Sequence, residues 1–255
     1  MNFSSTLKKL FIAATFIALV VGVFLIYALA GLNSSPVTYA EPPAFVESYG
    51  AKMAHSDPTY QSAELKIDKG QLATSQFSKL TGGLSVTEKL VFNVILGGNS
   101  SEVLTRLFAH PDKTQRIKVA SAFAAVNVRF SHNEETGFAD KRRQFWLDVE
   151  QHIPDIQNGL SEALISSAKA GKYSYTPYTL AWLPEQGRET VELFTWAAKH
   201  HPNASVRRSS LYYVVILGGN EDLAGPLLQN KTHDPDYKTR KEALELRYKR
   251  FTGQI

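Results

Sequence analysis

The sequence of 255 residues contains no cysteine. This absence excludes a disulfide scaffold, a zinc site built on thiolates and catalysis by a thiol nucleophile. It does not fix the compartment, because a chain of this length can bury a core that needs no disulfide in an oxidising space. Hydrophobic residues make up 44% and charged residues 20% of the chain, which is the composition of a folded protein.

Acidic residues are missing from the first 32 positions, where Lys8 and Lys9 are the only charged side chains. Without these two lysines the formal net charge falls from +4 to +2 over the remaining 223 residues. Nucleic-acid-binding domains carry a concentrated basic face, which this balance does not supply. The sequence therefore predicts no nucleic-acid partner.

One long hydrophobic run is present, LFIAATFIALVVGVFLIYALAGL at residues 10–32. As a helix this run would span roughly 34 Å, and the hydrocarbon core of a bilayer is about 30 Å thick. The lysines directly before it place residues 1–9 in the cytoplasm by the positive-inside rule. We therefore expect a transmembrane anchor at 10–32, a tether and lead-in at 33–69, and membrane attachment through the anchor.

This arrangement predicts a single-pass protein of a bacterial inner membrane, with its N-terminus inside and its C-terminal domain in the periplasm. The alternative is a signal peptide cleaved after Ala28-Leu29-Ala30, which would give a secreted protein. A signal peptide has a hydrophobic region of about 7–15 residues, so the length of the run favours a retained anchor.

Internal repetition begins with the hexapeptide VILGGN, which occurs at 94–99 and again at 215–220. Its glycine pairs, Gly97–Gly98 and Gly218–Gly219, are typical of a helix end, because glycine adopts the left-handed backbone conformation without steric penalty. The segment 85–88, Ser-Val-Thr-Glu, resembles a capping box at a helix start. The pattern predicts short helices separated by tight breaks.

A proline turn occurs three times, as HPDKTQR at 110–116, HPNASVR at 201–207 and DPDYKTR at 234–240. The proline ends one helix, and the Asp or Asn that follows it caps the next. Each copy closes on an arginine that precedes an apolar stripe of helical period. The motif residues are Pro111 and Arg116, Pro202 and Arg207, and Pro235 and Arg240.

These turns and the apolar helices that follow them resemble HEAT and HEAT-like repeats of the phycobilisome-lyase type. The resemblance covers about residues 70–252, and the units around 130–180 lack the Asp-Pro turn. It implies an all-α fold, an α-solenoid of five or six helix pairs in a domain at 70–255. It also implies that the motif arginines are structural and that second helices line a concave surface, where Arg208 and Tyr212 would bind a partner.

No catalytic motif, metal-ligand pattern or cofactor fingerprint is found, so the sequence predicts no metal site and no cofactor. His200 and His201 are adjacent, and neighbouring residues do not share a helix face. A catalytic cleft would need several titratable groups to converge, with His200, His201, Glu189 and Asp148 as the candidates.

Two further segments are candidates for functional surfaces. The polar stretch 129–143 is expected to form a long inserted loop between helices. The stretch Tyr173–Tyr178 is an aromatic-rich turn that would either bind a partner or cover the core beside Trp182.

The leading hypothesis is a membrane-anchored, extracytoplasmic scaffold that binds a protein or peptide partner without catalysis. One alternative is an enzyme of lyase or hydrolase type, or an envelope ligand binder, on the same helical scaffold. Another is a purely structural spacer or assembly subunit. The partner's identity and the oligomeric state do not follow from the sequence.

Overall fold

The computed structural model describes residues 36–45, 81–97, 104, 107–131, 138–184, 186–217 and 220–255. Every regular element within these ranges is a helix, and none is a strand. The all-α prediction is therefore confirmed for the described part of the chain. The expected cytoplasmic stretch 1–9, most of the tether and lead-in at 33–69, and the first residues of the expected repeat domain, 70–80, lie outside it.

Within the described ranges, no helix combines the length and the apolar character that crossing a bilayer requires. This finding corrects the expected localisation, a single-pass inner-membrane protein with a periplasmic domain. The run at 10–32, on which that expectation and its secreted alternative both depended, is not among the described residues.

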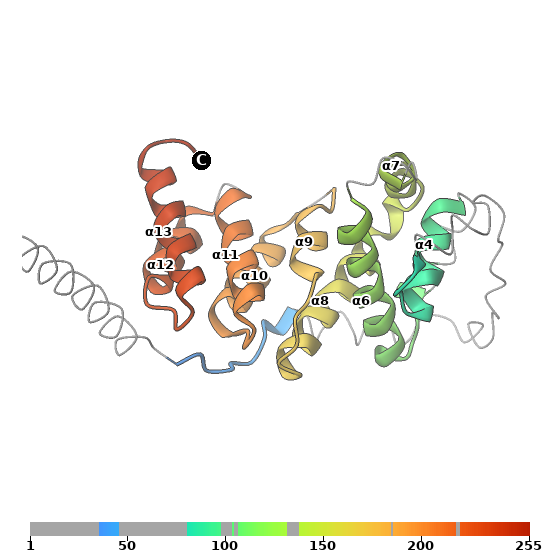
Figure 1. The fold of residues 1–255 in the computed structure, drawn as a ribbon, viewed down its shortest axis with the longest axis horizontal. Coiled ribbons are helices and arrows are strands. Elements are labelled where there is room, and N and C mark those ends of the chain that lie inside the picture. Colours follow the sequence, from blue (N-terminus) through green and yellow to red (C-terminus); the bar gives the residue numbers. More distant parts are fainter. Residues whose placement is uncertain are drawn as a thin grey trace, which may run out of the picture.

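The helices follow one another along the longest axis of the molecule (Figure 1). Helix α4 lies near one end of the array, and α12 and α13 lie at the other. In chain order the elements are α4 (Val86–Gly97), α6 (Lys113–Phe130), α7 (Phe138–Asp148), the 3-10 turn η3 (Glu150–His152), α8 (Ile153–Lys169), α9 (Thr176–Ala181), α10 (Arg188–His200), α11 (Ala204–Ile216), α12 (Glu221–Lys231) and α13 (Tyr237–Phe251).

Side-chain caps fix where the helices begin. The capping box before α4 is confirmed, since the Ser85 amide donates to Glu88 Oε2 at 2.7 Å and the Glu88 amide donates to Ser85 Oγ at 3.3 Å. The residue after each motif proline caps the next helix through amides of its first turn. Asp112 caps α6, Asn203 caps α11 and Asp236 caps α13.

The helices share one continuous hydrophobic core, in which most helices pack against others close to them in the chain, while α7 packs on α4. Helix α6 packs on α4 and α8, α10 packs on α11, and α11 packs on α13. A close contact lies at Gly159 of α8, where an added Cβ would be 2.7 Å from Cδ1 of Phe108. Phe108 also makes an edge-to-face contact with Phe123, with ring centroids 5.5 Å apart.

The prediction of a loop over 129–143 is wrong at both ends of the segment, which are helical. Helix α6 continues to Phe130, whose ring packs on Phe92 with centroids 4.4 Å apart, and α7 already begins at Phe138. The polar residues of α7 lie on its outer side, while Phe145 is buried. A polar helix face was therefore mistaken for a loop.

Residues 36–45, which fall within the expected tether, lie against α10 (Figure 1). The Trp196 indole N–H donates to the Ala40 carbonyl at 3.0 Å, and Nδ1 of His200 lies 2.9 Å from the Thr38 carbonyl oxygen. The Tyr39 and Trp196 rings meet edge-to-face with centroids 6.1 Å apart. This segment, called the strap below, joins positions more than 150 residues apart in the sequence.

Candidate binding surface

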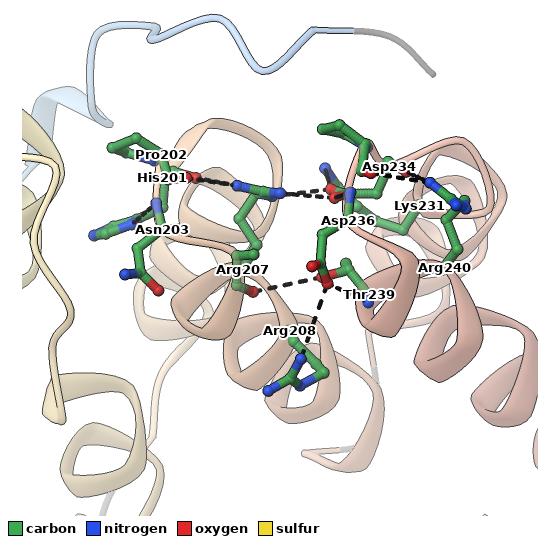
Figure 2. Close-up of polar contacts among 12 residues, drawn as sticks. His201, Pro202, Asn203, Arg207, Arg208, Lys231, Asp234, Asp236, Thr239 and Arg240 are labelled. Atoms are coloured by element: carbon green, nitrogen blue, oxygen red, sulfur yellow. Dashed lines mark hydrogen bonds and ion pairs between the residues drawn. The ribbon is translucent and has the colours of Figure 1, made fainter. Parts of the chain in front are cut away.

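Three arginines make the same pair of hydrogen bonds in the three proline turns. Figure 2 shows two of these turns, with Arg207 and Arg240. In each turn the Nη1 group donates to two backbone carbonyls, first that of the residue before the motif proline and then that of the proline itself. These bonds measure 2.7 and 3.0 Å for Arg116, 3.0 and 2.9 Å for Arg207, and 2.7 and 3.0 Å for Arg240. The arginine thus fixes the turn by which the chain enters each second helix.

Two of these arginines also hold a carboxylate from a later helix pair or turn. Arg116 donates from Nε and Nη2 to the two oxygens of Glu162 in α8, at 2.9 and 2.8 Å. Arg207 donates in the same way to Asp234 at 2.9 and 2.7 Å. Both arginines are almost fully buried. The planar guanidinium suits this paired geometry, so each arginine joins one unit of the array to the next.

Asp234 receives a further hydrogen bond from Lys231 Nζ at 2.9 Å (Figure 2). Burial alone would raise the pKa of Asp234, but the hydrogen bonds from Arg207, the Asp236 amide and Lys231 outweigh burial and lower it. Burial in turn lowers the pKa of Lys231, and the contact with Asp234 opposes that shift. The junction is therefore a compact cluster of two cations and one carboxylate.

His201 occupies the position of Asp234 in the preceding turn and is fully buried. Its Nδ1 accepts the Asn203 amide at 3.1 Å, so Nε2 carries the proton and faces Ser167 Oγ at 3.0 Å. Burial, reinforced by the nearby positive charge of Arg207, lowers the pKa of His201 to about 4. His201 is thus a neutral structural residue that links α8 to the turn before α11.

The glycines of the VILGGN repeat are only partly described. Gly97 is the last residue of α4, and α11 ends at Ile216, just before the second glycine pair. Gly98, Gly218 and Gly219 lie outside the described residues.

Exposed and half-buried aromatic side chains gather where α9 meets α11, and they define the aromatic surface. The Tyr178 and Trp182 rings lie 6.0 Å apart, and the Tyr173 and Tyr175 rings 4.7 Å apart. Trp182 is the most exposed of the group at 59%. The aromatic surface comprises Tyr173, Tyr175, Tyr178, Trp182 and Tyr212, with Arg208 at its edge.

Tyr213 lies beneath the aromatic surface and connects its parts. Its ring is 5.5 Å from that of Tyr212 and 5.6 Å from that of Phe194 in the core. Burial, followed by the proximity of Tyr178, Tyr212 and Tyr173, raises the pKa of Tyr213. The tyrosines from the turn before α9 and from α11 therefore belong to one cluster.

Arg208 and Tyr212, the two residues expected to bind a partner, lie on α11 within this cluster. Burial and the neighbouring Tyr175 raise the pKa of Tyr173, whereas Arg208 lowers it, which places the guanidinium near that phenol. Arg208 Nη1 is also 3.9 Å from Asp236 Oδ2, and its side chain is 30% exposed (Figure 2). Arg208 is therefore still accessible to a ligand.

The four residues proposed for a catalytic cleft do not converge. Glu189 lies in the first turn of α10 and His200 in the last, about 16 Å apart at 1.5 Å per residue. His201 is committed to its turn, and Asp148 on α7 accepts a hydrogen bond from Gln144. Within the described ranges, no group of three or more His, Asp or Glu could hold a metal ion.

A small recess of about 240 Å³ lies between the strap and the C-terminal helices. Its lining includes Pro36, Thr38, His200, Lys231 and Asp234. The polar groups of the last three already have partners in the strap or the turn junction, and Lys199, Asn230 and His233 complete the polar lining.

Comparison with known proteins adds no relative. No family model matches the chain, and neither does any curated protein or solved structure.

Proposed function

We propose that this protein is a HEAT-like α-solenoid that acts as a non-catalytic scaffold and binds a protein or peptide partner. Three observations support the solenoid: most described helices pack on helices close to them in the chain, the same arginine-locked turn occurs three times, and buried arginine–carboxylate pairs link two of these turns to a later helix or turn. In such an array, each unit is stabilised mainly by its neighbours and presents one face to solvent.

The aromatic surface is the single observation that carries the binding role. Tyrosine, tryptophan and arginine are the residues most enriched among those that dominate binding energy at protein interfaces. Their rings offer a large contact area with few rotatable bonds, so little conformational entropy is lost on binding. Exposed Tyr173, Trp182 and Tyr212 together with Arg208 form such a set around the packed helices α9 and α11.

The chemistry of this surface favours a segment with apolar side chains and a nearby acidic group. The rings would pack on the apolar side chains of the partner, and the accessible guanidinium of Arg208 would bind a carboxylate. The catalytic alternative lacks a comparable observation, because its candidate residues are dispersed over α7 and the two ends of α10.

Site-specific photocrosslinking tests this proposal. A photoreactive phenylalanine analogue placed at Trp182 or Tyr212 of the full chain should capture a discrete partner in cells. The matched control is the same analogue at Leu147, which is exposed on α7 away from the aromatic surface. Capture at Trp182 and Tyr212, lost on Arg208→Glu, would support the role. Equal capture at all three positions, or none at any, would overturn it.

A further inference from the structure

The outer side of α13 carries a row of exposed apolar residues with helical spacing. Leu244 is 55%, Tyr248 64% and Phe251 90% exposed. With Arg240 one turn before Leu244, these residues form a stripe along one side of the helix. This stripe, comprising Arg240, Leu244, Tyr248 and Phe251, is called the terminal face.

Aligning the last two proline turns shows what the terminal face is equivalent to. An offset of 33 residues places Arg240 on Arg207, Leu244 on Leu211 and Tyr248 on Val215. The α11 residues at these positions are buried: Arg207 is 3%, Leu211 0% and Val215 9% exposed, because α12 and α13 pack against α11. The terminal face therefore keeps the character of a surface between units, without a covering unit among the described residues.

The guanidinium of Arg240 is held as in the other motif arginines, but without a carboxylate partner among the described residues. Its Nη1 donates to the Asp234 and Pro235 carbonyls as the other motif arginines do, and this holds the guanidinium in the same orientation (Figure 2). In Arg207 the remaining Nε and Nη2 groups hold Asp234. No carboxylate within the described ranges takes that place at Arg240, although the donors are already set in position.

The charge of α13 indicates what kind of partner the terminal face would bind. Helix α13 contains six basic and two acidic residues, so the helix as a whole is positively charged. Two copies of α13 placed face to face would bring these charges together, which opposes a symmetric dimer through the terminal face. An acidic, amphipathic helix would complement both the charge and the apolar stripe.

The chain itself contains an example of such a helix. Residues 221–236 form α12 and the following turn, which covers part of α11 and presents Asp234 to Arg207. This stretch has four acidic residues and one lysine, and its buried side includes Ala224, Leu227 and Leu228.

We infer that the terminal face docks an acidic amphipathic helix of a partner protein, with a carboxylate held by Nε and Nη2 of Arg240. The partner helix would pack on α12 and α13 as α12 packs on α10 and α11. This surface differs from the aromatic surface, so the two proposals can succeed or fail separately.

Binding of a probe peptide tests the inference. A fluorescent peptide with the sequence of residues 220–237 is titrated against the full chain at low salt and followed by anisotropy. Saturable binding should weaken at least tenfold with Arg240→Glu or Leu244→Asp, and tenfold when the peptide carries Asp234→Asn. Lys238→Glu makes the same charge change on exposed α13 and should alter the affinity less than threefold, and Trp182→Ala should not alter it.

Three outcomes would overturn the inference. One is no binding at millimolar peptide, and another is equal weakening by Lys238→Glu and Arg240→Glu, which would indicate non-specific attraction. The third is a dimer of the chain in light scattering that Leu244→Asp converts to a monomer, which would make a second copy the occupant. Circular dichroism of each variant checks that the substitutions, all at exposed or half-buried positions, preserve the fold.

Discussion

Arg207 and Asp234 are 27 residues apart in the chain and form a buried two-point ion pair, with Nε–Oδ2 at 2.9 Å and Nη2–Oδ1 at 2.7 Å. The arginine fixes its own turn through two carbonyls, and the aspartate fixes the following turn by accepting the Asp236 amide at 3.0 Å. One contact therefore connects two consecutive turns of the array.

Replacing Arg207 with leucine should destabilise the protein by about 3–5 kcal/mol, because Asp234 would stay buried with Lys231 as its remaining cation. Arg240→Leu is the matched control, since Arg240 makes the same carbonyl bonds but holds no carboxylate among the described residues. Its cost should be about 1 kcal/mol. Urea unfolding followed by circular dichroism measures both, and equal losses would contradict the role assigned to the ion pair.

Acid should weaken the fold through His201. Its pKa is about 4 in the folded state and about 6.5 when unfolded, so the unfolded chain binds the proton more tightly. The stability that neutral His201 contributes is complete above pH 6.5 and is lost as the pH falls towards 4, by about 3 kcal/mol in all.

The difference in unfolding free energy between pH 7 and pH 4.5 should therefore shrink by about 2 kcal/mol in His201→Asn, whose amide oxygen can still accept the Asn203 N–H. His110→Asn is the control, because His110 has the same place in the first turn and is only half-buried. A pH dependence unchanged by His201→Asn would rule out this origin of the acid sensitivity.

Gly159→Ala should destabilise the protein by about 1–2 kcal/mol, although alanine is the better helix former. The new methyl group would overlap the Phe108 ring, which packs edge-to-face on Phe123 and has little room to move. Thermal unfolding measures the loss. Adding Phe108→Leu should make Gly159→Ala less harmful than it is alone, and strictly additive effects would show that the two residues do not collide.

Trp196→Phe should loosen the strap without unfolding the helices. Phenylalanine keeps a ring beside Tyr39 but removes the N–H that donates to the Ala40 carbonyl. Loss of one hydrogen bond of about 1 kcal/mol corresponds to about fivefold faster amide exchange in residues 36–45. Hydrogen exchange with mass spectrometry measures it, with residues 237–251 as the internal reference. Trp182→Phe should leave the strap unchanged.

The local parts of the fold were predictable because each depends on a short sequence signal. The capping box at Ser85 and Glu88 and the caps after each motif proline follow directly from residue type and spacing. The first half of helix α7 was missed because its polar side resembles a loop and its buried side is short.

The long-range partners were not predictable from the motif alone. The partner of Arg207 is Asp234, the first residue of the next motif turn. The next motif turn after Arg116 instead begins with His201, which cannot accept two arginine donors. The carboxylate for Arg116 comes instead from the middle of α8, at Glu162. An acidic residue inside the otherwise apolar and small segment 159–165 was the available signal.

The aromatic surface was visible only in pieces. Tyr173–Tyr178 and Tyr212 each stood out in the sequence, and their proximity depends on how α9 packs against α11. That packing involves the chain around α9 and α10, where no copy of the repeated HPD or DPD turn marks the boundary of a unit.

The strap constrains the order in which parts of the chain fold. Its hydrogen bonds to α10 close a loop of more than 150 residues, so they form only after α10 has folded, and they add little until then. Because the strap is bound to α10, a pulling force applied to the strap would act on the helices first at Trp196 and His200, in the C-terminal half of the array. Helix α4, which precedes α10 in the sequence, would be bypassed.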